Sequence, residues 1–220
     1  MNKFEILKTW TPFLLEGLAL NLMMSIVATV IGIALGSLLL WLTFFKLKPI
    51  RWVGLFVPTI VRGAPTLFLL FYIAILLPSE IIIFDGKIII ELPNWLKASF
   101  ALSASPLAFT SWSLKDSIEQ WKNGHHNKAL LFIPNLTNGF IITLLASSGA
   151  SLVGVDELVA RTNTVIKLAG SENSVLLYSY STTIFIIVAL IITLFIQTIR
   201  GILSNRMANK IKNNKIISDS

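Results

Sequence analysis

Long apolar stretches alternate with short polar segments along the chain. Uncharged stretches extend over residues 17–45, 98–114, 129–155 and 173–199, and residues 52–79 form a fifth stretch that only Arg62 interrupts. A helix of about 20 apolar residues crosses the hydrocarbon core of a bilayer, and each stretch approaches or exceeds that length. The pattern therefore predicts five transmembrane helices, at residues 13–45, 52–78, 96–114, 130–154 and 175–200.

The connection between the second and third predicted helices has the pattern of a β-hairpin. Residues 81–90 are Ile-Ile-Ile-Phe-Asp-Gly-Lys-Ile-Ile-Ile. Asp-Gly between two β-branched runs is the typical sequence of a tight hairpin turn. We therefore expect a small β-hairpin on the outer membrane surface. A cap over the loop is its simplest interpretation, and its function stays open.

The composition supports a membrane protein. Of the 220 residues, 55% are hydrophobic and only 13% are charged, with a mean hydropathy of +0.77. A soluble domain carries about 25% charged residues, so a soluble enzyme and a disordered protein are both excluded. The absence of cysteine excludes disulfides and thiolate chemistry. The expected fold class is an all-α integral membrane protein with a single transmembrane domain over residues 1–220.

Lysine and arginine are distributed unevenly over the predicted connections, which sets the orientation. Cytoplasmic loops of membrane proteins carry an excess of these residues. One side holds eleven of the 18, namely Lys46, Lys48, Arg51, Lys115, Lys122, Lys128, Arg200, Arg206, Lys210, Lys212 and Lys215. We therefore expect the N-terminus outside and the C-terminus in the cytoplasm, with a frayed basic tail at residues 206–220. The first apolar run is too long for a signal peptide, so the first helix is expected to remain in the mature protein.

Arg62 is the first candidate functional residue because it falls inside the second predicted span. An arginine in hydrocarbon is costly, so it is expected to face protein, water or headgroups. Pro65 lacks an N–H group and Gly63 weakens a helix, which predicts a kink or a restart of the span here. Arg62 then either lines a path or clamps a neighbouring helix, or it extends to the cytoplasmic interface at a helix break.

Small polar residues accumulate in the third and fourth spans. The fourth contains Ser147, Ser148 and Ser151, and the third carries the hydroxyl residues Ser103, Ser105, Thr110, Ser111 and Ser113. Such residues suit either a pathway for a polar solute or tight helix packing. Ser147, Ser148 and Ser151 are therefore candidate path or gate residues. In the first span, Gly32 and Gly36 form a Gly-x-x-x-Gly pattern, which predicts close helix contact.

The acidic pair Asp156-Glu157 follows the fourth span on the predicted outer side. The pair either attracts a cation or a docking partner, or Asp156 begins a solvated loop. Glu157 is a further candidate for the path. His125 and His126 have no third ligand nearby, so a solvated loop is their expected setting. The sequence contains no nucleophile–base pair, phosphate loop or nucleotide motif. We therefore expect neither an enzyme nor a cofactor or metal bound by this chain.

Four stretches within residues 12–205 match the motifs of one family. Residues 15–22, Leu-Glu-Gly-Leu-Ala-Leu-Asn-Leu, are similar to Leu-x-Gly-Leu-x-x-Thr, and residues 62–67, Arg-Gly-Ala-Pro-Thr-Leu, resemble the more specific Arg-Gly-Thr-Pro-Leu-Leu. Residues 108–125 follow the register of Ala-Tyr-x-x-Glu-x-x-Arg-x-x-Ile-x-x-x-x-x-Gly-Gln, and residues 148–158 resemble Thr-Ser-Leu-x-Ser-Val-Ile-Gly-Val-x-Glu-Leu. The chain thus resembles the permease subunits of ABC importers for polar amino acids.

This resemblance implies a multi-pass protein of the bacterial cell inner membrane with the type I importer fold. Two permeases, identical or different, would enclose the path of a polar amino acid or similar small solute within the membrane lipid. A cytoplasmic ABC ATPase would hold ATP and Mg²⁺, an extracytoplasmic solute-binding protein would deliver the solute, and no nucleic acid would take part. Arg62, Gly63 and Pro65 would be a structural hinge, and the ATPase-facing loop would contain Asn123, Gly124, His125, Asn127, Lys128 and Ala129.

The chain departs from the family pattern at several positions. Asn127-Lys128-Ala129 occupy the place of the family's Glu-Ala-Ala motif, and the next apolar run follows at once, so the coupling loop is expected to be shortened and degenerate. Trp112 stands where the family has glutamate, and Leu145 where it commonly has lysine. Two alternatives therefore stay open: a degenerate structural partner of an intact permease, and a channel or carrier that works without an ATPase.

Overall fold

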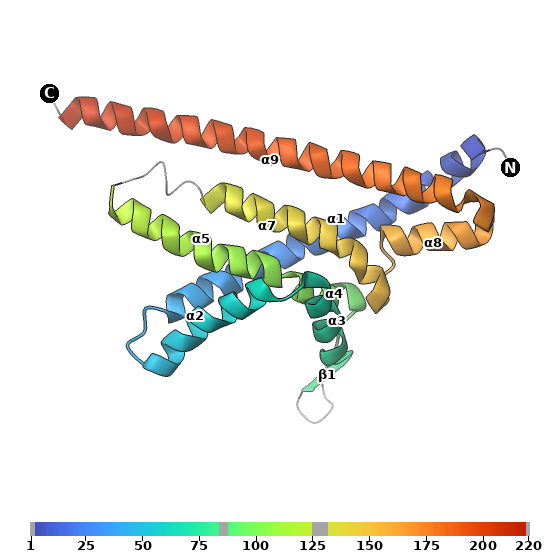
Figure 1. The fold of residues 1–220 in the computed structure, drawn as a ribbon, viewed down its shortest axis with the longest axis horizontal. Coiled ribbons are helices and arrows are strands. Elements are labelled where there is room, and N and C mark those ends of the chain that lie inside the picture. The colour runs from blue at the N-terminus through green and yellow to red at the C-terminus, as the bar shows by residue number, and fades with distance from the viewer. Residues whose placement is uncertain (1–2, 84–87, 125–131, 219–220) are drawn as a thin grey trace.

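The computed structural model describes residues 3–83, 88–124 and 132–218, and this part of the chain is mostly helical (Figure 1). Its elements in chain order are α1 (Lys3–Leu42), α2 (Lys48–Gly63), α3 (Thr66–Leu76), β1 (Glu80–Ile83), β2 (Ile88–Glu91), α4 (Asn94–Leu102), α5 (Ala104–Lys122), α7 (Phe132–Ser147), the 3₁₀ helix η1 (Ser148–Val153), α8 (Leu158–Ala169), the short 3₁₀ helix η2 (Ser171–Asn173) and α9 (Ser174–Ser218).

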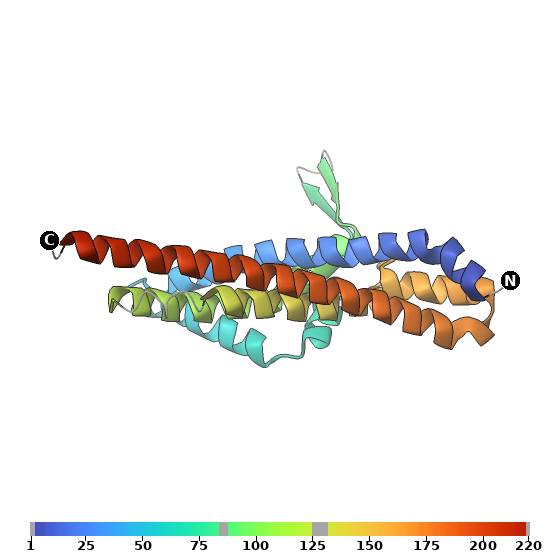
Figure 2. The same ribbon diagram turned by 90° about the horizontal axis from the view of Figure 1, so that it is seen from above.

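The long helices α1, α5, α7 and α9 lie roughly along one axis, with the two ends of the chain at opposite ends of the molecule (Figures 1 and 2). Helix α1 is central, since it contacts α2, α4, α5, α7 and α8 and makes its most extensive contact with α5. Helices α3 and α4 and the strand pair extend away from this axis near its middle (Figure 1). The bundle is thus organised around α1.

Two glycines allow α5 to approach α1 closely. A Cβ atom added at Gly32 would lie 2.7 Å from the Cβ of Pro106, and one added at Gly36 would lie 2.6 Å from the carbonyl oxygen of Leu107. Real Cβ atoms do not approach their neighbours this closely. The close contact predicted from the Gly-x-x-x-Gly pattern is therefore confirmed, and it determines where α5 lies.

Two apolar clusters form the core. One joins the middle of α1 to α3 and α4, and its buried residues include Met24, Ala28, Leu70 and Leu102. The other joins the N-terminal part of α1 to α8 and α9, through Ile6, Leu14, Leu18, Leu158, Val165 and Leu177. By contrast, only 6% of the residues in the most apolar part of Ser171–Ile199, which belongs to η2 and α9, are buried. The exposed apolar surface of α9 therefore suits direct contact with lipid.

Three helical segments of the described chain are long and apolar enough to cross a membrane. They are α1, the α7–η1 segment over Phe132–Val153, and residues Ser171–Ile199 of η2 and α9. Helices α2 and α3 add a fourth if they form one span, bent by 114° at their junction. The chain is therefore a multi-pass membrane protein, and the count of five spans stays a prediction.

Several helix boundaries differ from the bounds of the predicted spans. The first helix begins at Lys3 rather than residue 13, because its N-terminal turns pack Ile6 into the core. The third predicted span, residues 96–114, is divided at Ser103 between α4 and α5. The expected frayed tail continues α9 as helix through Ser218, in a segment that contains no proline.

The sequence interpretation also missed α8 altogether. Glu157 is its N-cap residue and Gly170 its C-cap residue, so the sequence carried a start and a stop signal for a 12-residue helix. This segment is too short and polar to have the pattern of a span.

The two strands flank the predicted hairpin turn. β1 and β2 pair antiparallel, with Ile81 opposite Ile90 and Ile82 opposite Ile89. The turn residues Asp85 and Gly86 lie outside the described residues. The turn and the position of the strands on the outer membrane surface stay predictions.

Candidate functional site

The junction between α2 and α3 is the most pronounced break in the described chain. Ala64, the C-cap of α2, is extended (φ −83°, ψ 135°), and Pro65, the N-cap of α3, is extended as well (φ −61°, ψ 129°). Proline disfavours the helical conformation of the residue before it and has no N–H group to continue the helix. The break predicted from Gly63 and Pro65 is therefore confirmed, while its role as a moving hinge stays a prediction.

Arg62 lies in the last turn of α2, beside this break. Its guanidinium carbon is 5.5 Å from the centroid of the Trp112 ring on α5. A cation is also favoured at this end of a helix, where the dipole is negative. The side chain thus lies against protein and lines a cavity. This favours the interpretation in which Arg62 lines a path or contacts a neighbouring helix over the one in which it extends to the membrane interface.

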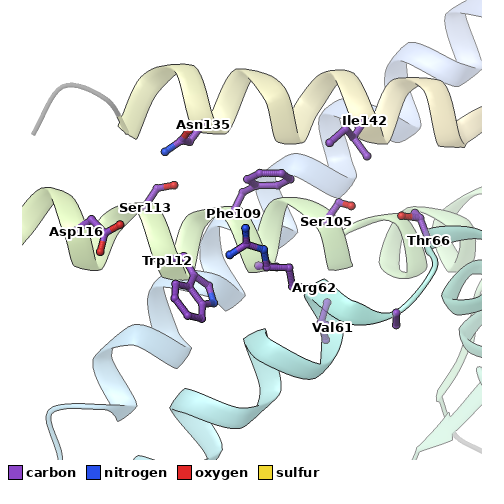
Figure 3. Close-up of a pocket in the computed structure, with 12 residues that line it drawn as sticks. Val61, Arg62, Thr66, Ser105, Phe109, Trp112, Ser113, Asp116, Asn135 and Ile142 are labelled. Carbon is purple, nitrogen blue, oxygen red and sulfur yellow. The ribbon is translucent and has the colours of Figure 1, made fainter. Parts of the chain in front are cut away.

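A cavity of about 470 Å³ adjoins the break, between the α2–α3 junction, α5 and α7 (Figure 3). Its polar lining residues come from four helices and are Arg62, Thr66, Ser105, Ser113, Asp116 and Asn135, beside the aromatic residues Phe109 and Trp112. Cavities of a few hundred Å³ with a few polar groups are typical of small-molecule sites. The sequence interpretation missed Asp116 and Asn135, because nothing in their local pattern places them beside Arg62.

A buried hydrogen-bonded cluster ties α1 to α7 and α8. Asn21 donates through Nδ2 to Ser147 Oγ at 2.9 Å and to Glu157 Oε2 at 3.0 Å, and its Oδ1 accepts the N–H of Leu158 at 3.1 Å. Asn21, Ser147 and Glu157 are each fully buried. A buried cluster whose polar atoms are all hydrogen-bonded fixes how the helices align. Any shift of one helix along another would leave a buried polar group without a hydrogen-bond partner.

Glu157 serves as the N-cap of α8. Its carboxylate accepts the backbone N–H of Val159 at 3.0 Å and that of Ala160 at 3.1 Å. Burial raises the pKa of Glu157, against the opposing effect of hydrogen bonds from Val159, Asn21 and Ala160. The structure therefore places Glu157 inside the protein, where the cap and Asn21 hold it, and its role in the path stays a prediction.

Arg161 adds a second tie between α8 and α1. Its NH1 group lies 2.6 Å from Glu16 Oε2 and donates to the carbonyl oxygen of Phe13 at 2.9 Å. Its Nε lies 3.4 Å from Asp156 Oδ2. Asp156 is exposed, as predicted for a solvated loop, yet it takes part in this ion pair.

A second cavity, of about 340 Å³, lies between α7, α8 and α9. Its lining includes Ser148 together with Thr162 and Ser181, whose hydroxyl oxygens lie 2.7 Å apart. Ser151 instead donates to the carbonyl oxygen of Ser148 at 3.2 Å. The candidate path residues are thus divided: Ser148 lines a cavity, whereas Ser147 and Glu157 belong to the buried cluster.

Only the beginning of the predicted ATPase-facing loop is described. Asn123 is the C-cap of α5, and Gly124 follows with a positive φ of 77°, the conformation that commonly ends a helix. His125, Asn127, Lys128 and Ala129 lie outside the described residues. The shortening of this loop stays a prediction.

Comparisons with known proteins agree with the family resemblance. No family model matches the chain. In sequence it is 28% identical, over 119 residues, to the arginine transport system permease protein ArtQ of Bacillus subtilis (strain 168); the match covers 54% of this chain and 51% of that protein. The matched region thus spans about half the length of this curated relative.

The likeness in structure extends further. A chain in the crystal structure of an amino acid ABC transporter with histidines aligns with a TM-score of 0.65 and 19% sequence identity, over 94% of this chain and 99% of that one. The chain therefore has the fold of a chain of an amino acid ABC transporter. The resemblance to amino-acid permeases drawn from the motifs is confirmed.

Proposed function

We propose that this chain is the membrane-spanning permease subunit of an ABC importer. With a second permease it forms the path of a polar amino acid or similar small solute, and a separate ATPase drives the transport. The observation that carries the proposal is the fold match over nearly the whole length of both chains, with a TM-score of 0.65. The sequence match to an arginine permease supports the same solute class.

The proposed topology has five spans, with the N-terminus outside and the C-terminus in the cytoplasm. The three long apolar segments provide spans one, four and five, and the bent α2–α3 pair provides span two. Span three is α4 with α5, whose polar residues are protected from lipid by α1 and α7. The basic residues after α1 and near the end of α5 then lie on the cytoplasmic side, and the strand pair extends toward the outside.

Alternating access requires one part of the permease to move against another. Asn21, Ser147 and Glu157 hold α1, α7 and α8 together as one body. Residues 62–65 are the proposed hinge, because two helices meet there through two extended residues. Ser148 and Ser151 lie at the junction of α7 and η1, where a gate would close the path.

The proposed cytoplasmic contact is the segment from Asn123 to Ala129, which follows the end of α5. The preceding helix suits transmission, since α5 lines the cavity beside the hinge and packs along α1. A push on this end of α5 would therefore reach Arg62 through Trp112.

Reconstitution tests the proposal. The full chain would be placed in proteoliposomes with an ABC ATPase and a solute-binding protein from the same organism, and uptake of labelled amino acids would be measured. We expect uptake that requires ATP and stops when the ATPase carries a substitution of its ATP-binding lysine. Uptake that persists without the ATPase but collapses with an uncoupler would instead support a carrier.

The degenerate-partner alternative has a different outcome in the same assay. If the chain transports only when an intact second permease is added, it is a structural partner. If no combination transports while the chain remains folded and inserted, the proposed function is wrong.

A further inference from the structure

The cavity beside the α2–α3 break contains two opposite charges that do not neutralise each other. Arg62 and Asp116 both line it, and both are exposed. Among the described residues, both ion pairs belong to Arg161, and neither Arg62 nor Asp116 has a partner within ion-pair distance. Arg62 falls within the second predicted span, where an arginine is costly without compensation. Because both side chains are exposed, water or a ligand can solvate them.

The two charges face the same space. Trp112 and Asp116 are four residues apart on α5, which places them one turn apart on one side of the helix. Arg62 reaches that side from α2 and lies over the Trp112 ring (Figure 3). The face of an aromatic ring attracts a guanidinium but offers it no carboxylate, so its N–H donors stay available for another partner. Arg62 is thus held beside the cavity with donors available for a carboxylate.

We infer that this cavity binds the α-carboxylate and α-ammonium groups of an amino acid whose side chain is uncharged. Arg62 binds the carboxylate and Asp116 binds the ammonium group. This inference rests on the proposed function and deepens it, because it selects one substrate class for this chain. It also differs from the arginine named for the sequence relative.

The selection follows from charge balance. Among the described lining residues, the cavity holds one basic and one acidic side chain, which a zwitterion neutralises. A lysine- or arginine-like side chain would add a cation with no second acid to receive it. An acidic side chain would add an anion with no second base. An extra charge in the cavity loses part of its hydration without gaining an ion pair, so both charged classes should bind more weakly.

The rest of the cavity fits an uncharged side chain. Ser105 and Thr66 offer hydroxyl groups near the helix break, and Phe109 and Ile142 offer apolar surface. The volume of about 470 Å³ accommodates a polar amino acid of ordinary size.

Direct binding to the purified full chain in lipid nanodiscs tests the inference. Isothermal titration would compare L-glutamine, L-arginine and L-glutamate as probes. We expect L-glutamine to bind about 10-fold or more tightly than the other two, since each of those leaves one charge unpaired. Arg62→Gln and Asp116→Asn should each weaken L-glutamine binding by about 10-fold or more. Asp156→Asn, a change of an exposed acid far from the cavity in the chain, is the matched control and should bind as the wild type does.

A charge-insertion pair keeps the test independent of folding defects. Trp112→Glu places a carboxylate next to Arg62, which would occupy its donors and abolish L-glutamine binding. Trp112→Gln removes the same ring without adding charge and should retain more of the affinity. Equal loss in both variants would overturn the assignment, as would L-arginine binding more tightly than L-glutamine, or no binding of L-glutamine to the wild type.

The outcome can be separated from that of the proposed function. If ATP-driven uptake occurs in proteoliposomes but selects arginine, the permease proposal holds and the substrate class is wrong. If L-glutamine binds as expected but no ATPase drives its uptake, the site is right and the permease proposal is wrong.

Discussion

The close contact between α1 and α5 gives a prediction whose size follows from the structure. Gly36→Ala adds a Cβ atom 2.6 Å from the carbonyl oxygen of Leu107 and 2.8 Å from the Cβ of Thr110. Neither atom is the end of a flexible side chain, so the helices must move apart. Overpacking of this kind costs about 1–3 kcal/mol, while alanine improves helix propensity by about 1 kcal/mol. We expect a net loss of up to about 2 kcal/mol in the free energy of unfolding.

Gly201→Ala is the matched control for this substitution. Gly201 also lies within a helix, but a Cβ atom added there meets nothing within 4 Å. The same chemical change should therefore raise the free energy of unfolding by about 0.5–1 kcal/mol. Denaturation of both variants with SDS in mixed micelles, followed by tryptophan fluorescence, would give the difference, which we expect to be about 2 kcal/mol.

The reasoning would be refuted by a simple result. If both variants gained stability equally, the approach of α1 and α5 would not depend on Gly36. Gly32→Ala provides an independent check, since its added Cβ would lie 2.7 Å from Pro106. It should destabilise the protein in the same direction as Gly36→Ala.

Three further predictions concern the ties between α1 and α8. Asn21→Leu should lower the free energy of unfolding by about 2–4 kcal/mol in the same SDS assay, because Ser147, Glu157 and Leu158 lose a buried partner. Asn138→Leu, at an exposed position of α7, is its control. Burial raises the pKa of Glu157 above 4.5, so the folded state holds its proton more strongly than the unfolded state does. The wild type should therefore lose stability as the pH rises from 4.5 through the raised pKa, whereas Glu157→Gln should not, and parallel pH profiles would contradict this. Arg161→Leu should release α8 from α1 and speed hydrogen exchange in residues 158–169, with unchanged exchange as the contrary result.

Local chemistry made some features predictable from the sequence. The break at Pro65 follows from a missing N–H group, and the α1–α5 contact follows from two glycines one turn apart. Both depend only on residues that are neighbours along the chain. The apolar spans of α1, α7 and α9 were predictable for the same reason, because hydrophobic length alone decides which helices enter a bilayer.

Other features depend on contacts between distant segments. The cation–π contact between Arg62 and Trp112 joins residues 50 positions apart. The sequence around either residue does not indicate that the two meet. The buried carboxylate of Glu157 depends on a hydrogen bond from Asn21, which lies on α1 far away in the sequence. Nothing near either residue in the sequence indicates this pairing. Helix α8 was not predicted for a different reason: the sequence carries its caps, but the helix is short and polar and lacks the pattern of a membrane span.

The continuous 45-residue helix α9 has a mechanical consequence. At about 1.5 Å per residue it is about 68 Å long, whereas the hydrocarbon core takes up only about 30 Å. Roughly 20 residues after Ile199 then form a stiff rod about 30 Å long in water. Rotation of the embedded part by about 10° would displace the end of that rod by about 5 Å, so a spin label near residue 215 would magnify small movements of the span into distances that are easily measured.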